Sequence, residues 1–155
     1  MDVALIKIIS DGQTGADRAA LDWAIAHGVP HGGWCPKGRK AEDGAIASDY
    51  RLTETPSADY TQRTEWNVRD SDGTVVFSIA AVLAGGSKTT EELAEKHGKP
   101  CLHLSAQSDG DTASELLRQF IVQHGIRVLN VAGPQASKEP DVGGFVTRIL
   151  TAALT

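Results

Sequence analysis

Glycine, hydroxyl and charged residues occur together in loops that join an apolar run to a helical pattern. The first such loop, residues 11–17 (DGQTGAD), follows the apolar run 3–10. Glycines let the backbone approach an anion closely, and the free N–H groups at a helix N-terminus attract one. An anion cradle is one interpretation, and a tight turn with a first-turn acid is the other. The cradle would be formed by Gly12, Gln13, Thr14, Gly15 and Asp17.

The second loop, residues 85–92 (GGSKTTEE), adds an ammonium group and three hydroxyls to the same pattern. A lysine is a point charge well suited to phosphate or another oxyanion. The plain alternative is a helix that is capped near Thr89 or Thr90, with Glu92 near its third position. Such a cap is also compatible with an anion site, so both interpretations can hold together. Two such loops on one sheet favour an anion site. Its residues would be Gly85, Gly86, Ser87, Lys88, Thr89 and Thr90.

Other basic residues lie in three further segments. Lys37 and Arg39 belong to a polar stretch, 35–59, that is too long for a plain connection and is expected to act as a functional loop or lid. Arg63 lies in a polar helical pattern, where its guanidinium would bind a phosphate or a carboxylate such as Glu92. The glycine turn 132–138 brings Lys138, which would either reach a ligand or remain solvated.

The sequence shows no spacing typical of nucleophilic or metal chemistry. No G-x-S-x-G elbow is present, and the five histidines lack the spacing of metal ligands. The two cysteines, Cys35 and Cys101, form no disulfide framework, which favours a reducing, cytoplasmic compartment. We therefore expect no metal-ion site, and an enzyme is the less favoured class.

Strand-like and helical patterns alternate along the chain. Apolar runs at 3–10, 73–79, 99–105 and 126–133 predict strands, and residues 31–36 predict a short strand end. Helical patterns cover 15–28, 60–72, 111–125 and 142–154, and within 83–98 a glycine turn leads into a helix that carries Leu93 and Ala94 and stops at Gly98. This alternation predicts a single α/β domain over residues 1–155, with a doubly wound parallel sheet and helices on both faces. Ligands of such sheets bind at the carboxyl ends of the strands, where the glycine loops would lie.

Composition excludes several function classes. The chain has 155 residues and a net charge of −5, which argues against a general nucleic-acid binder. No apolar run approaches the length of about 18 residues that a membrane span needs. The N-terminal residues also lack the basic and apolar segments of a signal peptide.

Several uncommon strings occur in an order that identifies a family. The strings GQTGADRAALDWA, GWCPKGRKAEDG, YRLTE, RTEWNVRDSDGTVVFS and GGSKTTEELAEKHGKP run through the chain from about residue 6 to residue 150. In this order they resemble the molybdenum carrier proteins. That family is similar to a Rossmann-like group that includes the DNA-processing protein A fold and the lysine decarboxylase-like phosphoribohydrolases.

The resemblance implies a binding protein for molybdenum cofactor, a molybdenum–pterin phosphate. It implies storage, protection or delivery of the cofactor without turnover, and a soluble homodimer or homotetramer. Molybdoenzymes or cofactor-synthesis proteins would be its partners, with neither nucleic acid nor membrane involved. Whether the ligand is the intact cofactor, molybdate or tungstate stays open. The glycine cradles, Lys88 and the nearby arginines would hold the anionic ends of the ligand.

A second function remains open. The phosphoribohydrolases carry G-G-x-G-T-x-x-E, which this chain matches at Gly85, Gly86, Thr89 and Glu92 but not at Lys88, where the pattern has glycine. In that alternative the chain hydrolyses nucleoside 5′-monophosphates with Glu92 and Arg63 as the catalytic pair, or senses a nucleotide. Lys88 adds bulk and charge to the cradle, which favours holding an anionic ligand.

Overall fold

The computed structural model describes residues 3–155 and has a five-stranded parallel sheet at its centre. The strand order is β2-β1-β9-β7-β8. Ile8 of β1 pairs with His31 on one side and with Leu129 on the other. The strands are β1 (Lys7–Ile9), β2 (His31–Gly32), β7 (Gly73–Ser78), β8 (Cys101–Ser105) and β9 (Val128–Ala132).

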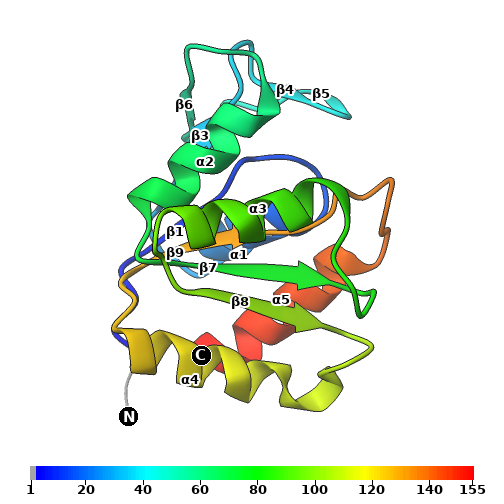
Figure 1. Cartoon of the computed structure of the whole chain (residues 1–155). Coiled ribbons are helices and arrows are strands. Elements are labelled where there is room, and N and C mark those ends of the chain that lie inside the picture. Colours follow the sequence, from blue (N-terminus) through cyan, green and yellow to red (C-terminus); the bar gives the residue numbers. More distant parts are fainter. Residues whose placement is uncertain (1–2) are drawn as a thin grey trace.

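Helices cover both faces of this sheet (Figure 1). On one face α1 (Ala16–Ala26) and α4 (Ala113–His124) both pack on α5 (Val142–Leu154), and the short 3-10 turn η1 (Gly110–Thr112) precedes α4. On the other face α2 (Tyr60–Asp70) packs beside α3 (Gly85–Lys96). The expected doubly wound, Rossmann-like α/β fold is confirmed.

Side chains of β7 point alternately into two apolar layers, because successive strand residues face opposite sides of a sheet. Val75 and Phe77 belong to the main core, together with residues of α1, α4 and α5. Val76 faces the other side and packs with Leu83 and Ala132. All six residues of β7 are buried, as expected for a central parallel strand.

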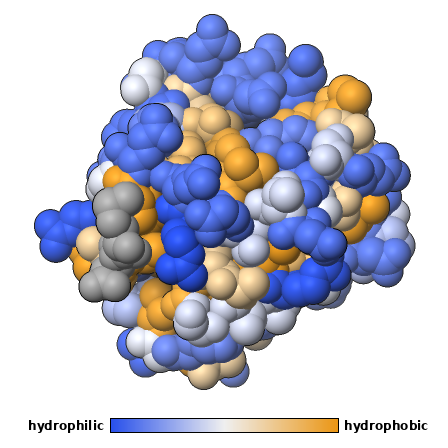
Figure 2. Space-filling model, turned by 90° about the horizontal axis from the view of Figure 1, so that it is seen from below, coloured by the Kyte–Doolittle hydropathy of each residue, from blue (hydrophilic) through white to orange (hydrophobic). Residues whose placement is uncertain are grey.

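The helix α4 shows how the outer surface stays polar. Leu117, Phe120 and Ile121 face the core, whereas Glu115 and Gln119 face outward. Figure 2 shows the molecule from below, the side on which α4 lies in Figure 1. Hydrophilic residues cover much of this face, and hydrophobic residues show in patches between them. No helix among residues 3–155 has the length and apolar character that crossing a membrane requires.

The polar stretch 35–59 folds without a helix. It contains a hairpin of β4 (Lys40–Ala41) and β5 (Gly44–Ala45), which we call the 40–45 hairpin. It also contains β6 (Thr53–Glu54), which pairs in parallel with β3 (Trp34–Cys35). In Figure 1 these short strands lie above the main sheet, beside α2.

The structure shortens the first predicted strand and moves the start of one helix. Only Lys7–Ile9 of the run 3–10 form a strand. The third helix begins at Gly85, so Gly85 and Gly86 lie within its first turn instead of preceding it. Ala84 is the N-cap and supplies no side-chain hydrogen bond, so the predicted capping by Thr89 or Thr90 is wrong. The reason is local: both hydroxyls donate back to the carbonyls of Gly85 and Gly86.

Candidate functional site

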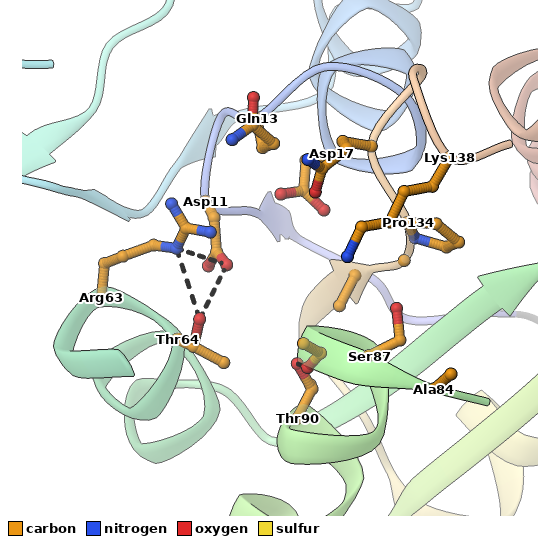
Figure 3. A pocket seen from close by; sticks show the side chains of 14 residues that line it. Asp11, Gln13, Asp17, Arg63, Thr64, Ala84, Ser87, Thr90, Pro134 and Lys138 are labelled. Atoms are coloured by element: carbon orange, nitrogen blue, oxygen red, sulfur yellow. Dashed lines mark hydrogen bonds and ion pairs between the residues drawn. The ribbon is translucent and has the colours of Figure 1, made fainter. Parts of the chain in front are cut away.

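A cavity of about 80 Å³ lies where the carboxyl ends of β1, β7 and β9 come together (Figure 3). A wider hollow of about 310 Å³ adjoins it and shares Gln13, Arg63, Thr64, Gly86, Gln135 and Lys138 with it. This is the edge at which parallel α/β sheets bind ligands. Four segments line the cavity: the loop after β1 (Asp11, Gln13, Asp17), α2 (Arg63, Thr64), the start of α3 (Ala84, Gly86, Ser87, Thr90) and the segment from Ala132 to Lys138.

Glycines allow the loop after β1 and the loop after β9 to touch. A Cβ on Gly15 would lie 2.5 Å from the carbonyl oxygen of Pro134, and the φ of Gly15 is +82°. A Cβ on Gly133 would lie 2.5 Å from the carbonyl oxygen of Phe77. The backbone N–H of Ala16 donates to the Pro134 carbonyl at 3.3 Å. The structure therefore shows a close approach of backbone to backbone at Gly15, while the approach of this loop to an anion stays a prediction.

Asp11 is held by three side chains at the floor of the cavity. Nε of Arg63 lies 2.9 Å from its Oδ2, and the hydroxyl of Thr64 donates to the same oxygen at 3.2 Å. The side-chain amide of Asn67 donates to its Oδ1. All four residues are buried, so the negative charge of Asp11 is compensated inside the protein.

Two buried polar atoms on residues that line this cavity have no hydrogen-bond partner among residues 3–155. They are Oδ1 of Asp17 and Nη1 of Arg63, both buried. Arg63 also stacks on Tyr60, with its guanidinium carbon 4.5 Å from the ring centre. Buried polar atoms normally have hydrogen-bond partners, so an unpaired donor and an unpaired carboxyl oxygen in one cavity point to a bound ligand.

Burial raises the pKa of Asp17 well above its ordinary value. The loss of hydration on burial is the largest cause, and the negative charge of Asp11 adds to it. Arg63, the backbone N–H of Gln13 and Arg18 lower the pKa in turn, but burial outweighs them. Asp17 therefore favours its neutral form far more than an exposed aspartate does.

The first turn of α3 supplies the opposite wall of the cavity. Gly86, Ser87 and Thr90 line it, because helix residues that lie three or four positions apart share one face. Thr89 lines only the wider hollow. Lys88 is exposed and lines neither, since the helix starts at Gly85 and the rotation per residue turns Lys88 away. The basic residue at this wall is Lys138, whose ammonium points into the cavity in Figure 3.

The two basic residues expected from the polar stretch lie elsewhere. The guanidinium of Arg39 donates to the carbonyls of Ile46, Leu52, Ala47 and Tyr50, at 2.8–3.3 Å, and so fixes the fold of this stretch. Lys37 is exposed. Neither residue lines the cavity, so the structure does not bring them to the predicted cradle.

The other residues of the first predicted cradle hold the 40–45 hairpin against the site. Gly12 accepts two hydrogen bonds from Arg18 through its carbonyl, and Arg18 also pairs with Asp43 at 2.9 Å. The hydroxyl of Thr14 donates to Glu42. Glu42 also accepts from the backbone N–H of Ser137 at 3.1 Å and from its hydroxyl at 2.6 Å. The hairpin thus joins the two loops that flank the cavity.

The alternative catalytic pair is not brought together. Arg63 lines the cavity, but Glu92 is exposed on α3 and does not. A Ser–His contact that the sequence did not suggest lies nearby, with 2.6 Å between Oγ of Ser78 and Nε2 of His103. Ser78 is 2% exposed, and its hydroxyl also lies 2.7 Å from the carbonyl oxygen of Ala80. Its burial and this second contact suit a structural role.

Other cavity residues were missed as individual predictions. Thr64, which lines the cavity, and Asn67, which donates to Asp11, were visible only as part of a polar helix. Lys138 was expected either to reach a ligand or to remain solvated, and the structure brings it to the cavity. A polar side chain on the buried side of a helical pattern was the available signal. Among residues 3–155, no group of three or more His, Cys, Asp or Glu side chains is placed to hold a metal ion.

Comparisons with known proteins agree with this architecture. None of the curated proteins with which the chain was compared matches it. A crystal structure described as "Putative molybdenum carrier protein" from Syntrophus aciditrophicus SB is 50% identical and superposes with a TM-score of 0.96. The match covers 100% of this chain and 98% of that one. The family model "Circularly permutated YpsA SLOG family" matches residues 8–154, so the chain belongs to this family, and its resemblance to the molybdenum carrier proteins is confirmed.

Proposed function

We propose that the chain binds molybdenum cofactor at this cavity and holds it without turnover, as a storage, protection or delivery protein. One observation carries the proposal: the free guanidinium edge of Arg63 and the ammonium of Lys138 face one cavity at the first turn of α3. Two cations and a helix N-terminus suit an oxyanion. The 50% identical structure described as a molybdenum carrier supports the same ligand class.

The sizes of the two spaces fit a ligand with a small anionic end and a larger body. A cavity of about 80 Å³ suits a single tetrahedral oxyanion. The adjoining hollow of about 310 Å³ would accommodate part of a heterocycle. We place the phosphate of the cofactor, or its molybdenum oxyanion centre, in the cavity, with the pterin in the hollow.

A second candidate is a nucleotide-binding sensor. The same division into a phosphate-sized cavity and a wider hollow fits a nucleoside monophosphate. Hydrolysis of that nucleotide is the less favoured function, because Glu92 faces solvent. A thermal-shift screen separates the candidates, since a ligand that binds only the folded state raises the melting temperature. A larger shift with nucleotides than with cofactor would favour the sensor.

The proposal is tested by loading purified protein with cofactor, desalting it, and measuring the molybdenum and pterin retained per chain. We expect stoichiometric retention of both. Lys138→Ala removes one charged contact, worth roughly 1.5–3 kcal/mol, and should weaken binding by about 10- to 150-fold. Lys88→Ala is the matched control, because this exposed lysine lies outside the cavity. Absence of retention, or equal loss in both variants, contradicts the proposal.

We further propose that the chain acts in the cytoplasm as one domain, assembled into a homodimer or homotetramer. It would deliver its ligand to molybdoenzymes or cofactor-synthesis proteins. Light scattering during size-exclusion chromatography, with and without cofactor, measures the assembly. A monomer under both conditions would overturn this part of the proposal.

A further inference from the structure

Asp17 is the exception in a cavity otherwise built for an anion. The side chains of Arg63 and Lys138 approach from two sides, and the hydroxyls of Ser87 and Thr90 line a third. The carboxyl group of Asp17 points into the same space. An ionised carboxylate here would repel the oxyanion that the other groups attract. The protonation state of Asp17 therefore decides what this cavity binds.

Within the described part of the chain, the charged groups that act on Asp17 or share its cavity come from four segments. Asp11 follows β1 and pairs with Arg63, Thr64 and Asn67, and its negative charge still acts on Asp17. Arg63 on α2 directs Nε at Asp11. Arg18 on α1 directs its guanidinium at Asp43 and the Gly12 carbonyl. Lys138, after β9, is the remaining cation, and α3 contributes only uncharged groups to the cavity.

None of these groups forms a hydrogen bond with Oδ1 of Asp17. Asp17 is 3% exposed, so water does not replace the missing partner readily. Its Oδ1 is buried and unpaired, on a residue that lines the cavity. A protonated carboxyl group is a hydrogen-bond donor, and an oxyanion is the acceptor that fits it.

We propose that Asp17 binds the oxyanion in its protonated form and donates a hydrogen bond to one oxygen, so that binding at higher pH takes up one proton. This inference rests on the proposed function, because it concerns the same cavity. The carboxylate gains a proton from solvent, and the Oδ–H bond then points at the ligand oxygen. The negative charge of the ligand favours the protonated form further.

The shifted titration of Asp17 supports this assignment. Burial and the charge of Asp11 both raise its pKa, which lowers the cost of protonation near neutral pH. The site would therefore load at lower pH and release as the pH rises. The shared chemistry is a tetrahedral oxyanion, which is either the phosphate of the cofactor or free molybdate.

Molybdate alone is the probe of choice. A phosphate monoester takes up its own second proton at a pH of about 6, which would mask the titration of the protein. Calorimetric titration is made between about pH 6 and about pH 9 in two buffers of different ionisation enthalpy. The difference between the buffers counts the protons taken up. Cofactor and a phosphate monoester are titrated in parallel to identify which oxyanion the cavity prefers.

Above the pKa of free Asp17 we expect affinity for molybdate to fall about tenfold per pH unit, with uptake of one proton. Asp17→Asn keeps a donor that does not titrate, so its affinity should be nearly independent of pH, with no proton uptake. Asp111→Asn, an exposed aspartate outside the cavity, is the control and should behave as the unmodified chain. Circular dichroism verifies that each variant is folded.

Three outcomes overturn the inference. One is affinity for molybdate that rises with pH; another is the same pH dependence in Asp17→Asn. The third is loss of molybdate binding by a folded Asp17→Asn at every pH, which would assign an ionised Asp17 to a ligand N–H. If cofactor is retained after desalting in any of these cases, the proposed function stands while the inference fails. If no cofactor is retained, the proposed function fails independently.

Discussion

Arg63 reaches Asp11 through Nε, at 2.9 Å, and leaves its Nη1 unpaired in the cavity. The guanidinium of Arg63 therefore pairs with the buried carboxylate of Asp11 and also lines the proposed ligand cavity. The pair has side-chain exposures of 9% and 11%, which places it among buried ion pairs. Its removal therefore has consequences for folding as well as for binding.

Asp11→Ala should destabilise the fold by about 3–5 kcal/mol, because it leaves Arg63 charged and uncompensated. The double variant with Arg63→Met should recover part of this loss, and urea unfolding measures both. Arg69→Ala is the control, since the exposed pair of Arg69 and Asp70 should contribute at most about 1 kcal/mol. Additive effects of the two cavity substitutions would argue against the ion pair.

Asp17→Asn should stabilise the ligand-free protein increasingly as the pH rises. Below the ordinary aspartate pKa, Asp17 is protonated in both the folded and the unfolded chain, so its titration does not change the free energy of unfolding. Above it the unfolded chain loses the proton first, because folding raises the pKa, and the free energy of unfolding falls with pH. That fall ends once the pH passes the folded pKa. Melting temperatures of both proteins between about pH 4 and about pH 8 measure the difference, and parallel curves would contradict it.

Gly15→Ala should cost about 1–3 kcal/mol or more, because the added methyl group meets the backbone of Pro134 in an unfavourable φ region. Gly144→Ala is a matched substitution in α5, where no atom lies within 4 Å of the new Cβ. It should be neutral or stabilising by up to about 1 kcal/mol, as alanine favours helix. Thermal unfolding of both variants distinguishes them. Similar losses would mean that the contact between the loops is not tight.

Glu42→Ala should loosen the 40–45 hairpin without unfolding the sheet. Glu42 accepts hydrogen bonds from Thr14 and from Ser137, and these contacts hold the two loops together. Amide hydrogen exchange should accelerate in the hairpin and at Ser137, while β7 stays protected. Lys40→Ala, on the same hairpin, controls for a change of surface residue. Unchanged exchange at Ser137 would show that Glu42 contributes no restraint.

Elements with strong local patterns were predictable. The run 73–79 is apolar and β-branched, and it became the buried strand Gly73–Ser78. The last helix begins and ends where its pattern does, at Val142 and Leu154. The two-residue strand β2 was expected only as a strand end, because two residues are too few for a periodic signal.

The cavity was predictable in its place but less so in its residues. Glycine loops at strand ends correctly indicated the edge of the sheet. The contact between Asp11 and Arg63 joins residues far apart in the chain, and no local pattern encodes it. Lys88 was misplaced because one position of uncertainty in the start of a helix rotates a side chain by about 100°. The lysine that does line the cavity is Lys138. It lies in the turn 132–138, and the conformation of this turn depends on the contact between the turn's backbone and Gly15.

The position of β9 bears on how the protein is made. This strand is the last of the five to leave the ribosome, yet it lies between β1 and β7 at the middle of the sheet. Until β9 is made, the pairs β1–β2 and β7–β8 cannot join into one sheet, since β1 has no direct pairing with β7. Lys138 emerges later still. A nascent chain arrested before residue 128 therefore has neither the complete sheet nor the Lys138 side of the cavity.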